Sequence, residues 1–278
     1  MYTSLSPGAI GVQATFEQGL QLAAQHGFDD LHFSIAEVAD LGLTRVKELR
    51  EATGIRLSAF GFPVDFRGSE QKYEKDLGDL FSLATLAAEL GALRTSTYLI
   101  PFSDELNFRD NFTLHRDRLR PVAEILADFG IRFGLEYVAP DTMRVGKQHL
   151  FVHTMEQTRE LCEAIGTNVG FLIDSWHWYN ARETSENLRS LSADFVVDVH
   201  VNDAPNRPLI DQVDHQRAMP GETGVIDIVV FLNALRDIGY DGPVMAEPFS
   251  EEINGLPDDE ACAETLASLR RVLRKVGL

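Results

Sequence analysis

The 278-residue chain has 44% hydrophobic and 24% charged residues, which is the composition of an ordinary soluble globular protein. Its 43 Asp and Glu residues against 25 Lys and Arg residues give a formal net charge of −18, which repels polyphosphates and argues against nucleic acid as a partner. No stretch approaches the roughly 20 apolar residues that a membrane span needs, so a membrane protein is also excluded.

Along the chain, an apolar strand-like run is followed eight times by an amphipathic helix-like run. The predicted strands are 2–6, 30–34, 55–60, 93–99, 131–137, 169–174, 195–201 and 243–248. The predicted helices are 16–25, 43–54, 70–90, 112–129, 155–165, 185–191, 226–238 and 260–276. No low-complexity linker or break in composition divides the chain. The alternation therefore predicts an α/β protein, a single (β/α)8 TIM barrel that spans residues 1–278 as one domain.

Glycine and proline mark several boundaries in this alternation. Gly27 follows the first predicted helix, where a positive φ ends a helix readily. Pro121 falls inside the predicted helix 112–129 and is expected to kink it. The longest irregular connection is 202–223, and connections of that length are usually functional or disordered.

The two cysteines, Cys162 and Cys262, are far apart in the sequence and have no CxxC spacing. Both fall within helical patterns, so we expect small buried residues rather than a redox pair. The first residues lack the basic and apolar regions of a signal peptide. These features predict a cytoplasmic protein.

Three acidic residues and one histidine stand at the carboxyl ends of four successive predicted strands. They are Glu136, Asp174, His200 and Glu247. Barrels of this class place their chemistry at that end of the strands. A single acid at a strand end is often only a cap for the next helix. Four such residues in succession instead indicate a common site.

A common site of three carboxylates and one imidazole has a clear chemical preference. Buried carboxylates repel one another in a low dielectric unless a cation or a proton holds them together. A mainly oxygen donor set of this kind suits Mn²⁺, Mg²⁺ or Co²⁺, with Zn²⁺ as a further candidate. The sequence therefore predicts one divalent metal ion.

Other residues near the predicted site have both functional and ordinary interpretations. His177 is a candidate substrate donor or a helix-start histidine exposed to water. Trp176 and Trp178 alternate around it, and Trp176 could stack on a sugar ring or simply pack in the core. Arg217, in the long connection, could anchor a substrate oxygen or pair with neighbouring acids.

A short basic cluster follows the fifth predicted strand, formed by Arg144, Lys147 and His149. It could recognise a phosphate or a carboxylate, or it could be a solvated loop. The chain has no P-loop, no GxGxxG motif and no GxSxG elbow. A nucleotide cofactor and a serine nucleophile are therefore not expected.

Five short motifs stand out along the chain: GLEY (134–137), LIDSWH (172–177), VHVND (199–203), PGETG (220–224) and EPF (247–249). Together they resemble the xylose-isomerase-like TIM-barrel sugar phosphate isomerase/epimerase superfamily. The resemblance covers the whole chain and is strongest between residues 131 and 249. The superfamily contains inosose isomerases, inosose dehydratases, ketose 3-epimerases, hydroxypyruvate isomerases and the endonuclease IV branch.

The resemblance implies roles for individual residues. It implies that the four strand-end residues bind one divalent metal and that Glu136 and Glu247 also act as an acid/base pair. It implies that His177 and Arg217 bind substrate. Endonuclease IV holds three zinc ions with additional histidines on earlier strands. Here 60–62 and 98–100 supply none, which argues against DNA repair.

The expected activity is that of a metal-dependent isomerase or epimerase of carbohydrate metabolism. It would move a proton next to the carbonyl of a sugar or keto-polyol through an enediolate. The sequence leaves two alternatives. One is a dehydratase or lyase acting on an inosose or 3-keto-sugar, and the other is a non-catalytic metal- or sugar-binding barrel subunit. It also leaves a homo-oligomer open.

Overall fold

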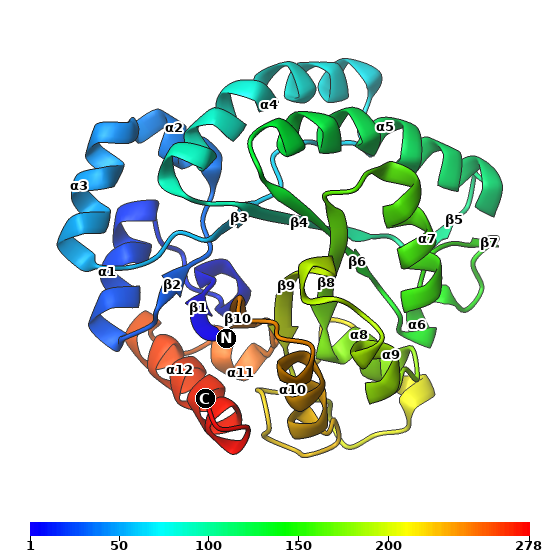
Figure 1. Ribbon diagram of the computed structural model, residues 1–278. Helices are drawn as coiled ribbons and strands as arrows, with labels where there is room; N and C mark the ends of the chain where they lie inside the picture. Colours follow the sequence, from blue (N-terminus) through cyan, green and yellow to red (C-terminus); the bar gives the residue numbers. More distant parts are fainter.

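Eight parallel strands form the centre of the computed structural model, which describes residues 1–278 (Figure 1). Their order in the sheet is β2-β1-β10-β9-β8-β6-β4-β3. Parallel bridges join Asp30 to Arg56 and Phe33 to Phe60, so the two edges of the sheet meet and the sheet closes. Helices surround it on all sides. The (β/α)8 barrel predicted from the sequence is confirmed.

The barrel strands are β1 (Tyr2–Leu5), β2 (Asp30–Leu31), β3 (Ala59–Gly61), β4 (Arg94–Leu99), β6 (Arg132–Tyr137), β8 (Val169–Asp174), β9 (Val196–Val201) and β10 (Pro243–Ala246). A separate antiparallel pair is formed by β5 (Phe102–Ser103) and β7 (His149–Leu150). The longer helices are α1 (Phe16–His26), α3 (Leu43–Thr53), α4 (Glu70–Leu90), α5 (Phe108–Asp128), α7 (Met155–Ile165), α10 (Ile228–Asp237) and α12 (Asp258–Lys275). The shorter ones are α2 (Ile35–Leu41), α6 (Asp141–Arg144), α8 (Ser175–Asn180), α9 (Ser185–Arg189), α11 (Glu251–Asn254) and the 3-10 turns η1 (Pro7–Ile10), η2 (Ala193–Phe195) and η3 (Leu209–Asp211).

Alternation along each strand separates the barrel interior from the helical layer. On β2 and just after it, Leu31 and Phe33 face outward: the Phe33 ring lies 5.7 Å from that of Phe16 on α1, and Leu31 packs against Gly19 of the same helix. On β9, Asp198 and His200 point to the other face of the sheet, toward the barrel interior, and are buried. The outward set forms the apolar core between sheet and helices, and the inward set carries the polar groups.

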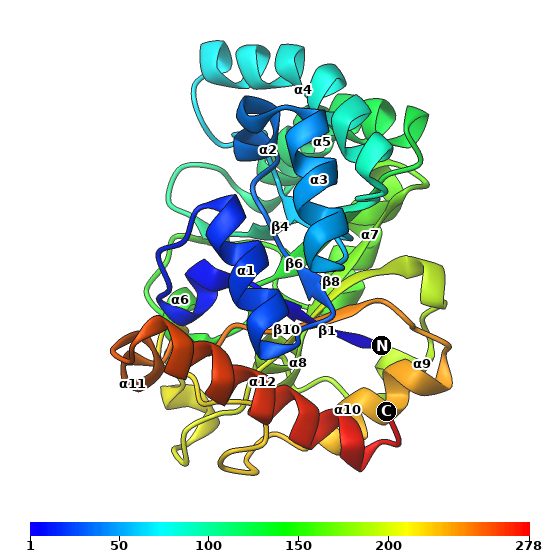
Figure 2. The same ribbon diagram turned by 90° about the vertical axis from the view of Figure 1, so that its left-hand side faces the viewer.

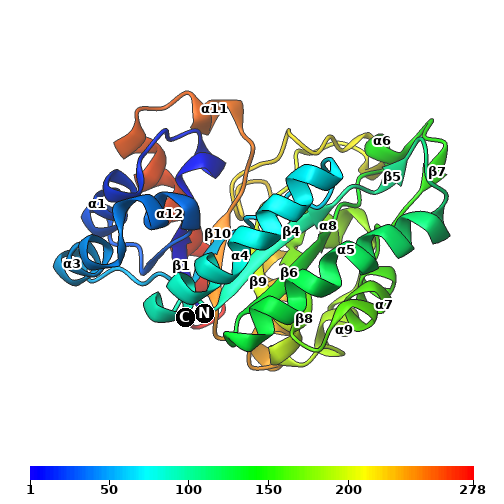
Figure 3. The same cartoon turned by 90° about the horizontal axis from the view of Figure 1, so that it is seen from above.

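The two ends of the barrel differ in what they carry. Figure 3 shows the short helices α6 and α11 at one end and both chain termini at the other. Figure 2 shows α1 and α12, from opposite ends of the sequence, lying side by side. In this contact, His26 Nε2 of α1 lies 2.9 Å from Asp259 Oδ1 of α12. The end with α6 and α11 is the carboxyl end of the strands, where the predicted site residues lie.

Several predicted boundaries are wrong near the second and third strands. β2 ends at Leu31 rather than residue 34, because Ser34 caps a helix by accepting a hydrogen bond from Glu37 N–H. That helix, α2, was not predicted. β3 covers Ala59–Gly61 rather than 55–60, since Arg56 contacts β2 only through an isolated bridge. Strands that pair at single points give a weak pattern in the sequence.

Other predicted elements shift by a few residues. α5 begins at Phe108 rather than residue 112, capped by Asn107, and continues through Pro121 to Asp128. The helix α8 starts directly after β8, and His177 lies within it and is buried rather than exposed to water. β10 ends at Ala246, one residue before the predicted site residue Glu247. The remaining long helices lie within about two residues of their predicted ends, as is usual for helix termini.

Two further observations concern the expectations from composition. No helix in the structure combines the length and the apolar character needed to cross a bilayer. Cys162 and Cys262 are both buried and unpaired, as predicted. Burial raises the pKa of the Cys162 thiol, which keeps that side chain in its unreactive form.

Candidate metal centre

The carboxyl ends of four neighbouring strands bring together the residues that the sequence singled out. Glu136 lies on β6, Asp174 ends β8, His200 lies on β9 and Glu247 follows β10. One ligand atom from each lies within 4.8 Å of the others. His200 Nδ1 is 3.4 Å from Glu247 Oε2, 3.8 Å from Glu136 Oε1 and 4.0 Å from Asp174 Oδ2.

The strand register explains why these four side chains meet. Asp174 of β8 pairs with His200 of β9, and His200 pairs with Met245 of β10. Paired residues on parallel strands point to the same face of a sheet. Glu247 comes two residues after Met245 and therefore faces the interior too. On the other side, Leu135 of β6 pairs with Phe171 of β8, which brings Glu136 level with Leu172, two residues before Asp174 and on the same face. Neighbouring strands of a single sheet are therefore sufficient to build the cluster.

The cluster is buried and has unpaired polar atoms. Glu136 is 6% exposed, Asp174 1% and His200 5%. Glu136 Oε1 and His200 Nδ1 have no hydrogen-bond partner. Buried polar atoms are nearly always paired, and an unpaired one is costly. Three carboxylates and an imidazole that converge with free ligand atoms match the donor set of a divalent cation.

The electrostatics of the cluster point the same way. Burial, and then the charge of Glu247, raise the pKa of the Glu136 carboxyl well above its ordinary value. Burial lowers the pKa of His200, but the nearby carboxylates, Glu247 first, outweigh it and raise that pKa to about 10. A bound cation would relieve this mutual repulsion of the buried carboxylates.

Asn202 holds two of the four residues in place. Its Nδ2 donates to both carboxylate oxygens of Asp174 at 3.1 Å, and its Oδ1 accepts from the Glu247 N–H at 2.8 Å. Ser175 Oγ bonds to both the N–H and the carbonyl of Asn202, at 2.8 Å each. Asn202 lies within the VHVND motif but was not among the predicted site residues. The sequence feature that could have identified Asn202 is its position two residues after His200, because alternate residues along a strand point to the same face of the sheet.

Arg217 reaches into the cluster from the long connection. Its Nη1 lies 2.9 Å from Asp174 Oδ2 and 3.2 Å from Glu247 Oε2, while Nη2 donates to Asp214 Oδ1 at 2.9 Å. The guanidinium also lies over two aromatic rings, at 4.5 Å from Phe249 and 5.6 Å from Trp176. Trp176 is fully buried. Asp214 and Phe249 had no assigned role in the sequence analysis.

His177 presents one nitrogen to the cluster. Its Nδ1 accepts a hydrogen bond from the Ala139 N–H at 3.3 Å, and burial lowers its pKa to about 4, so the ring is neutral with its proton on Nε2. Nε2 lies 3.9 Å from Glu136 Oε1 and 3.8 Å from Asp214 Oδ1. Arg217 Nη2 is 3.4 Å from Nε2, but two donors form no hydrogen bond. His177 therefore directs an N–H into the site.

The basic cluster after the fifth barrel strand is already engaged. Arg144 Nη2 donates to Asp141 Oδ1 at 2.5 Å and to the Ala139 carbonyl at 3.0 Å. Lys147 Nζ lies 3.8 Å from Asp104 and 3.9 Å from the Phe102 ring centre. His149 belongs to strand β7. Arg144 and Lys147 thus already contact nearby acids and do not form a free cationic pocket.

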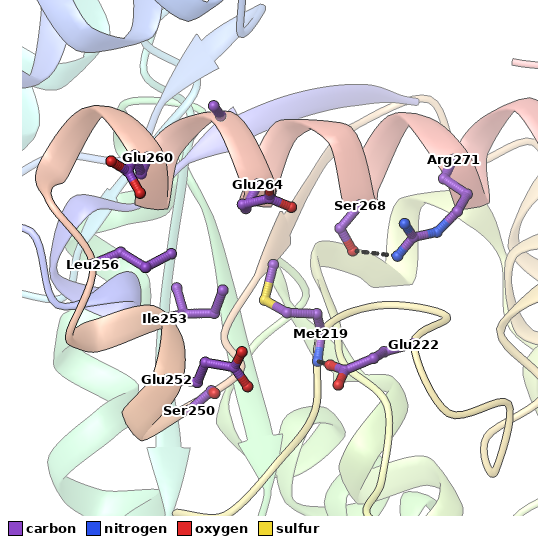
Figure 4. Close-up of a pocket in the computed structure, with 11 residues that line it drawn as sticks. Met219, Glu222, Ser250, Glu252, Ile253, Leu256, Glu260, Glu264, Ser268 and Arg271 are labelled. Carbon is purple, nitrogen blue, oxygen red and sulfur yellow. Dashed lines mark hydrogen bonds between the residues drawn. The ribbon is translucent and has the colours of Figure 1, made fainter.

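A cavity of about 470 Å³ is lined by none of the four cluster residues (Figure 4). α12 forms one wall, and α11 and the turn at 219–222 form the others. At this turn the Pro220 carbonyl accepts from Ser268 Oγ at 2.9 Å and from Arg271 Nη2 at 3.2 Å. A Cβ on Gly221, which has φ +67°, would lie 2.8 Å from Val272. The cavity thus borders the segment that anchors the Arg217 connection to α12.

A closed eight-stranded parallel barrel with a carboxylate and histidine cluster at its carboxyl end defines the class of this protein. It is a (β/α)8 barrel with a candidate metal centre. Residues 20–272 match the family model described as xylose isomerase-like TIM barrel, and the chain belongs to that family. The superfamily resemblance seen in the motifs is thereby confirmed.

Known proteins similar to this chain include enzymes of several kinds. It is 23% identical to an inosose isomerase of Bacillus velezensis over 94% of this chain and 93% of the relative. It is 26% identical to a 3-dehydroshikimate dehydratase of Pseudomonas putida over 95% of this chain, which spans only 41% of that relative.

Two solved structures are similar to the chain along its whole length. A xylose isomerase domain protein from Alicyclobacillus acidocaldarius superposes with a TM-score of 0.90 and 32% identity over 99% of both chains. The IolI protein, crystallised with a bound zinc atom, superposes with a TM-score of 0.82 and 21% identity over 99% of both chains. The second similarity, at this identity, concerns the fold alone.

Proposed function

We propose that this protein is a divalent-metal-dependent isomerase or epimerase that transfers a proton next to the carbonyl of a sugar or keto-polyol. The observation that carries the proposal is the convergence of Glu136, Asp174, His200 and Glu247 with unpaired ligand atoms. The inosose isomerase relative, similar to this chain along almost its whole length, supports it. The enzyme class thus rests on chemistry and similarity together.

The four residues would hold one divalent cation, which would polarise the substrate carbonyl as a Lewis acid and so acidify the adjacent C–H. The oxygen-rich donor set favours Mn²⁺, Mg²⁺ or Co²⁺ and also accepts Zn²⁺. Asn202 would keep Asp174 and Glu247 in the geometry for binding, through the hydrogen bonds described above.

The proton transfer falls to Glu136 and Glu247. They come from β6 and β10, the outer strands of the four that build the cluster, so they flank the space between them. Each carboxylate has two oxygens and can therefore take part in binding with one and move a proton with the other. One glutamate would remove the proton next to the carbonyl to give an enediolate. Return to the same carbon gives an epimer, and return to the neighbouring carbon gives an isomer.

His177 and Arg217 would position the substrate. The neutral His177 offers its Nε2–H at 3.9 Å from Glu136 Oε1, where it can donate to a substrate oxygen. Arg217 would hold a second oxygen, and its guanidinium is itself oriented by Asp214 and the ring of Phe249. Trp176, being fully buried, would act through its contact with the Arg217 guanidinium.

A second candidate is a metal-dependent dehydratase or lyase. The observation that favours it is the similarity to a 3-dehydroshikimate dehydratase over 95% of this chain. The same base would remove the same proton, and the substrate would then lose a hydroxyl group instead of regaining the proton. Product analysis by NMR separates the two, because elimination gives an unsaturated ketone and isomerisation does not.

The metal assignment is tested with His200→Ala. Removing the only nitrogen ligand from a buried carboxylate cluster is expected to abolish stoichiometric metal binding. Elemental analysis after incubation with Mn²⁺ should give about one equivalent in the wild type and almost none in the variant. His215→Ala, in the connection before Arg217, serves as a matched control. Full metal content in His200→Ala would refute the assignment.

The proton-transfer assignment is tested with Glu247→Gln. The amide keeps the size of the side chain but has no basic oxygen, so exchange of the substrate proton with D₂O should fall by at least about a hundredfold. Proton NMR of a ketose or inosose in D₂O measures this exchange, with the exposed Glu264→Gln variant as a control. Wild-type protein that binds metal and ketose yet never exchanges the proton would instead support a non-catalytic binding barrel.

A further inference from the structure

In the half of the barrel mouth opposite the metal centre, two further residues, Ser6 and His32, lie on the inward side of the strands. β1 pairs with β10 through Thr3 and Val244, so continuing the register brings Ser6 level with Glu247. β1 pairs with β2 through Leu5 and Leu31, which brings His32 level with Ser6. Residues level on parallel strands share a face. Ser6 and His32 therefore continue the inward row that begins at Glu247.

These two residues are among those that line a cavity of about 370 Å³ at the carboxyl ends of β1, β2 and β3, which extends outward to Leu31 and Phe33. The cavity is also lined by Gly8, Gln13 and Gly61. Gly61 lies next to the His32 ring, since a Cβ there would be in van der Waals contact with His32 Cε1 at 3.9 Å. Both Ser6 and His32 are partly exposed to this space.

His32 has hydrogen-bonding capacity that the protein does not use. Its backbone N–H donates to the Leu5 carbonyl at 2.9 Å, as part of the sheet. Its ring nitrogens and the Ser6 hydroxyl make no hydrogen bond to other protein groups, whereas other partly buried histidines, such as His153, do. Protein atoms around the ring lower the pKa of His32, and the charges acting on it are those of Asp198, His200 and Glu247. The ring thus shares its surroundings with the metal centre.

We propose that His32 and Ser6 form the far end of the substrate site and bind a hydroxyl group on a carbon remote from the reacting carbonyl. A neutral imidazole supplies one donor and one acceptor, which matches a hydroxyl group. This inference rests on the proposed function, because it assigns the substrate of that site to polyols long enough to span the barrel mouth.

The spacing of the strands sets the length of that substrate. Glu247 and His32 lie on strands two positions apart, so their backbones are separated by about 10 Å, or two inter-strand spacings. We therefore expect a three-carbon ketone held at the metal centre to fall short of His32. A six-carbon ring places its far hydroxyl groups on the opposite side from the carbonyl. The site should therefore distinguish six-carbon from three-carbon substrates through His32.

The test compares two probes in wild type and His32→Phe, which keeps a flat ring and removes the hydrogen bonds. The probes are dihydroxyacetone, with three carbons, and a six-carbon inosose, each followed by proton exchange in D₂O with Mn²⁺ present. We expect kcat/KM for the inosose to fall about tenfold while that for dihydroxyacetone is unchanged. Metal content should equal that of the wild type. His26→Phe, at the opposite end of α1, is the control.

Equal loss with both probes, or loss with neither, would overturn the proposal. A calorimetric measurement of myo-inositol binding to the Mn²⁺-loaded protein separates this outcome from failure of the proposed function, because it needs no turnover. If the wild type exchanges no proton but His32→Phe weakens inositol binding about tenfold, the subsite stands and the proposed activity fails. If inositol binds equally to both proteins, the subsite is refuted.

Discussion

Asn202 bonds to Asp174 and to the backbone of Glu247 at the same time, although it is not itself a candidate metal ligand. Groups of this kind orient ligands and are as necessary to a metal site as the ligands they hold. The amide is suited to the task because it donates to a carboxylate and accepts from an N–H with one planar group. A carboxylate at residue 202 would repel Asp174.

Asn202→Ala is expected to weaken Mn²⁺ affinity by about 10- to 100-fold while leaving the four ligands present. The loss follows because Asp174 would then be free to rotate and the Glu247 N–H would lose its acceptor. Titration calorimetry with Mn²⁺ measures the effect. Asn206→Ala, an exposed position on the same connection, is the control and should bind as the wild type. Unchanged affinity in Asn202→Ala would remove this residue from the site.

At the scale of single residues, the positions of the four candidate ligands could be predicted from the sequence, whereas the environment of Trp176 could not. The identity and spacing of Glu136, Asp174, His200 and Glu247 were sufficient to predict that they meet. The environment of Trp176 was not legible, because LIDSWH is compatible with an indole in a sugar site or in the core. Its full burial under Arg217 depends on the path of the long connection, which the local sequence does not encode.

At the scale of elements, β8 depends on a close approach that only glycine permits. A Cβ at Gly170 would lie 2.3 Å from the Phe195 carbonyl oxygen, at the point where η2 leads into β9. The obstacle is backbone, so no rotation of a side chain can relieve it. This contact fixes the spacing between the two strands that carry Asp174 and His200.

Gly170→Ala is therefore expected to lower the free energy of unfolding by about 1–3 kcal/mol through overpacking. The same change at Gly78, which is exposed within α4 with nothing near its Cβ position, should raise it by about 0.5–1 kcal/mol because alanine is the better helix former. Urea unfolding of both variants gives the two values. Similar effects at the two positions would contradict the role of Gly170.

The errors in predicted elements share a physical origin. β2 and β3 are short because they meet only through isolated bridges, so few of their residues are held in a regular ladder. The helix α2 begins at a serine cap inside what the apolar pattern marks as a strand. The later strands, β6, β8 and β9, are buried on both faces and give continuous apolar runs, which is why their bounds were predicted closely.

At the scale of the whole molecule, the barrel interior contains a buried acid that takes no part in the candidate site. Asp30 of β2 is fully buried, and this burial raises the pKa of its carboxyl from 3.8 to about 7. It accepts hydrogen bonds from Ser4 Oγ at 2.7 Å and from the Ser58 N–H at 2.9 Å. These bonds join β1, β2 and the segment before β3 within the barrel.

The raised pKa makes stability depend on pH in a definite direction. Between pH 4 and 7 folded Asp30 retains a proton that the unfolded chain has released, so its stabilising effect is complete below pH 4 and is lost as the pH rises to 7. Asp30→Asn cannot ionise. Its free energy of unfolding relative to the wild type should therefore increase by about 3 kcal/mol between pH 5 and pH 8.

Urea unfolding at both pH values measures this difference, with the exposed Asp128→Asn variant controlling for the loss of one negative charge. A relative stability that does not change with pH would show that Asp30 ionises in the fold as easily as in the unfolded chain. A decrease instead of an increase would mean that its neighbours stabilise the charged form.

The sequence by itself determined the barrel class, the number of βα units, the four strand-end residues and the chemistry that they suit. These features depend on local patterns, since apolar runs, helix periodicity and strand-end acids can each be recognised within a short stretch of sequence. Only the tertiary structure decided that Asn202 bonds to two candidate ligands, that Arg217 enters the cluster over Phe249 and Trp176, and that His32 lies level with Glu247 in the closed sheet. Those relations join segments far apart in the chain, and they exist only once the sheet has closed and set its register.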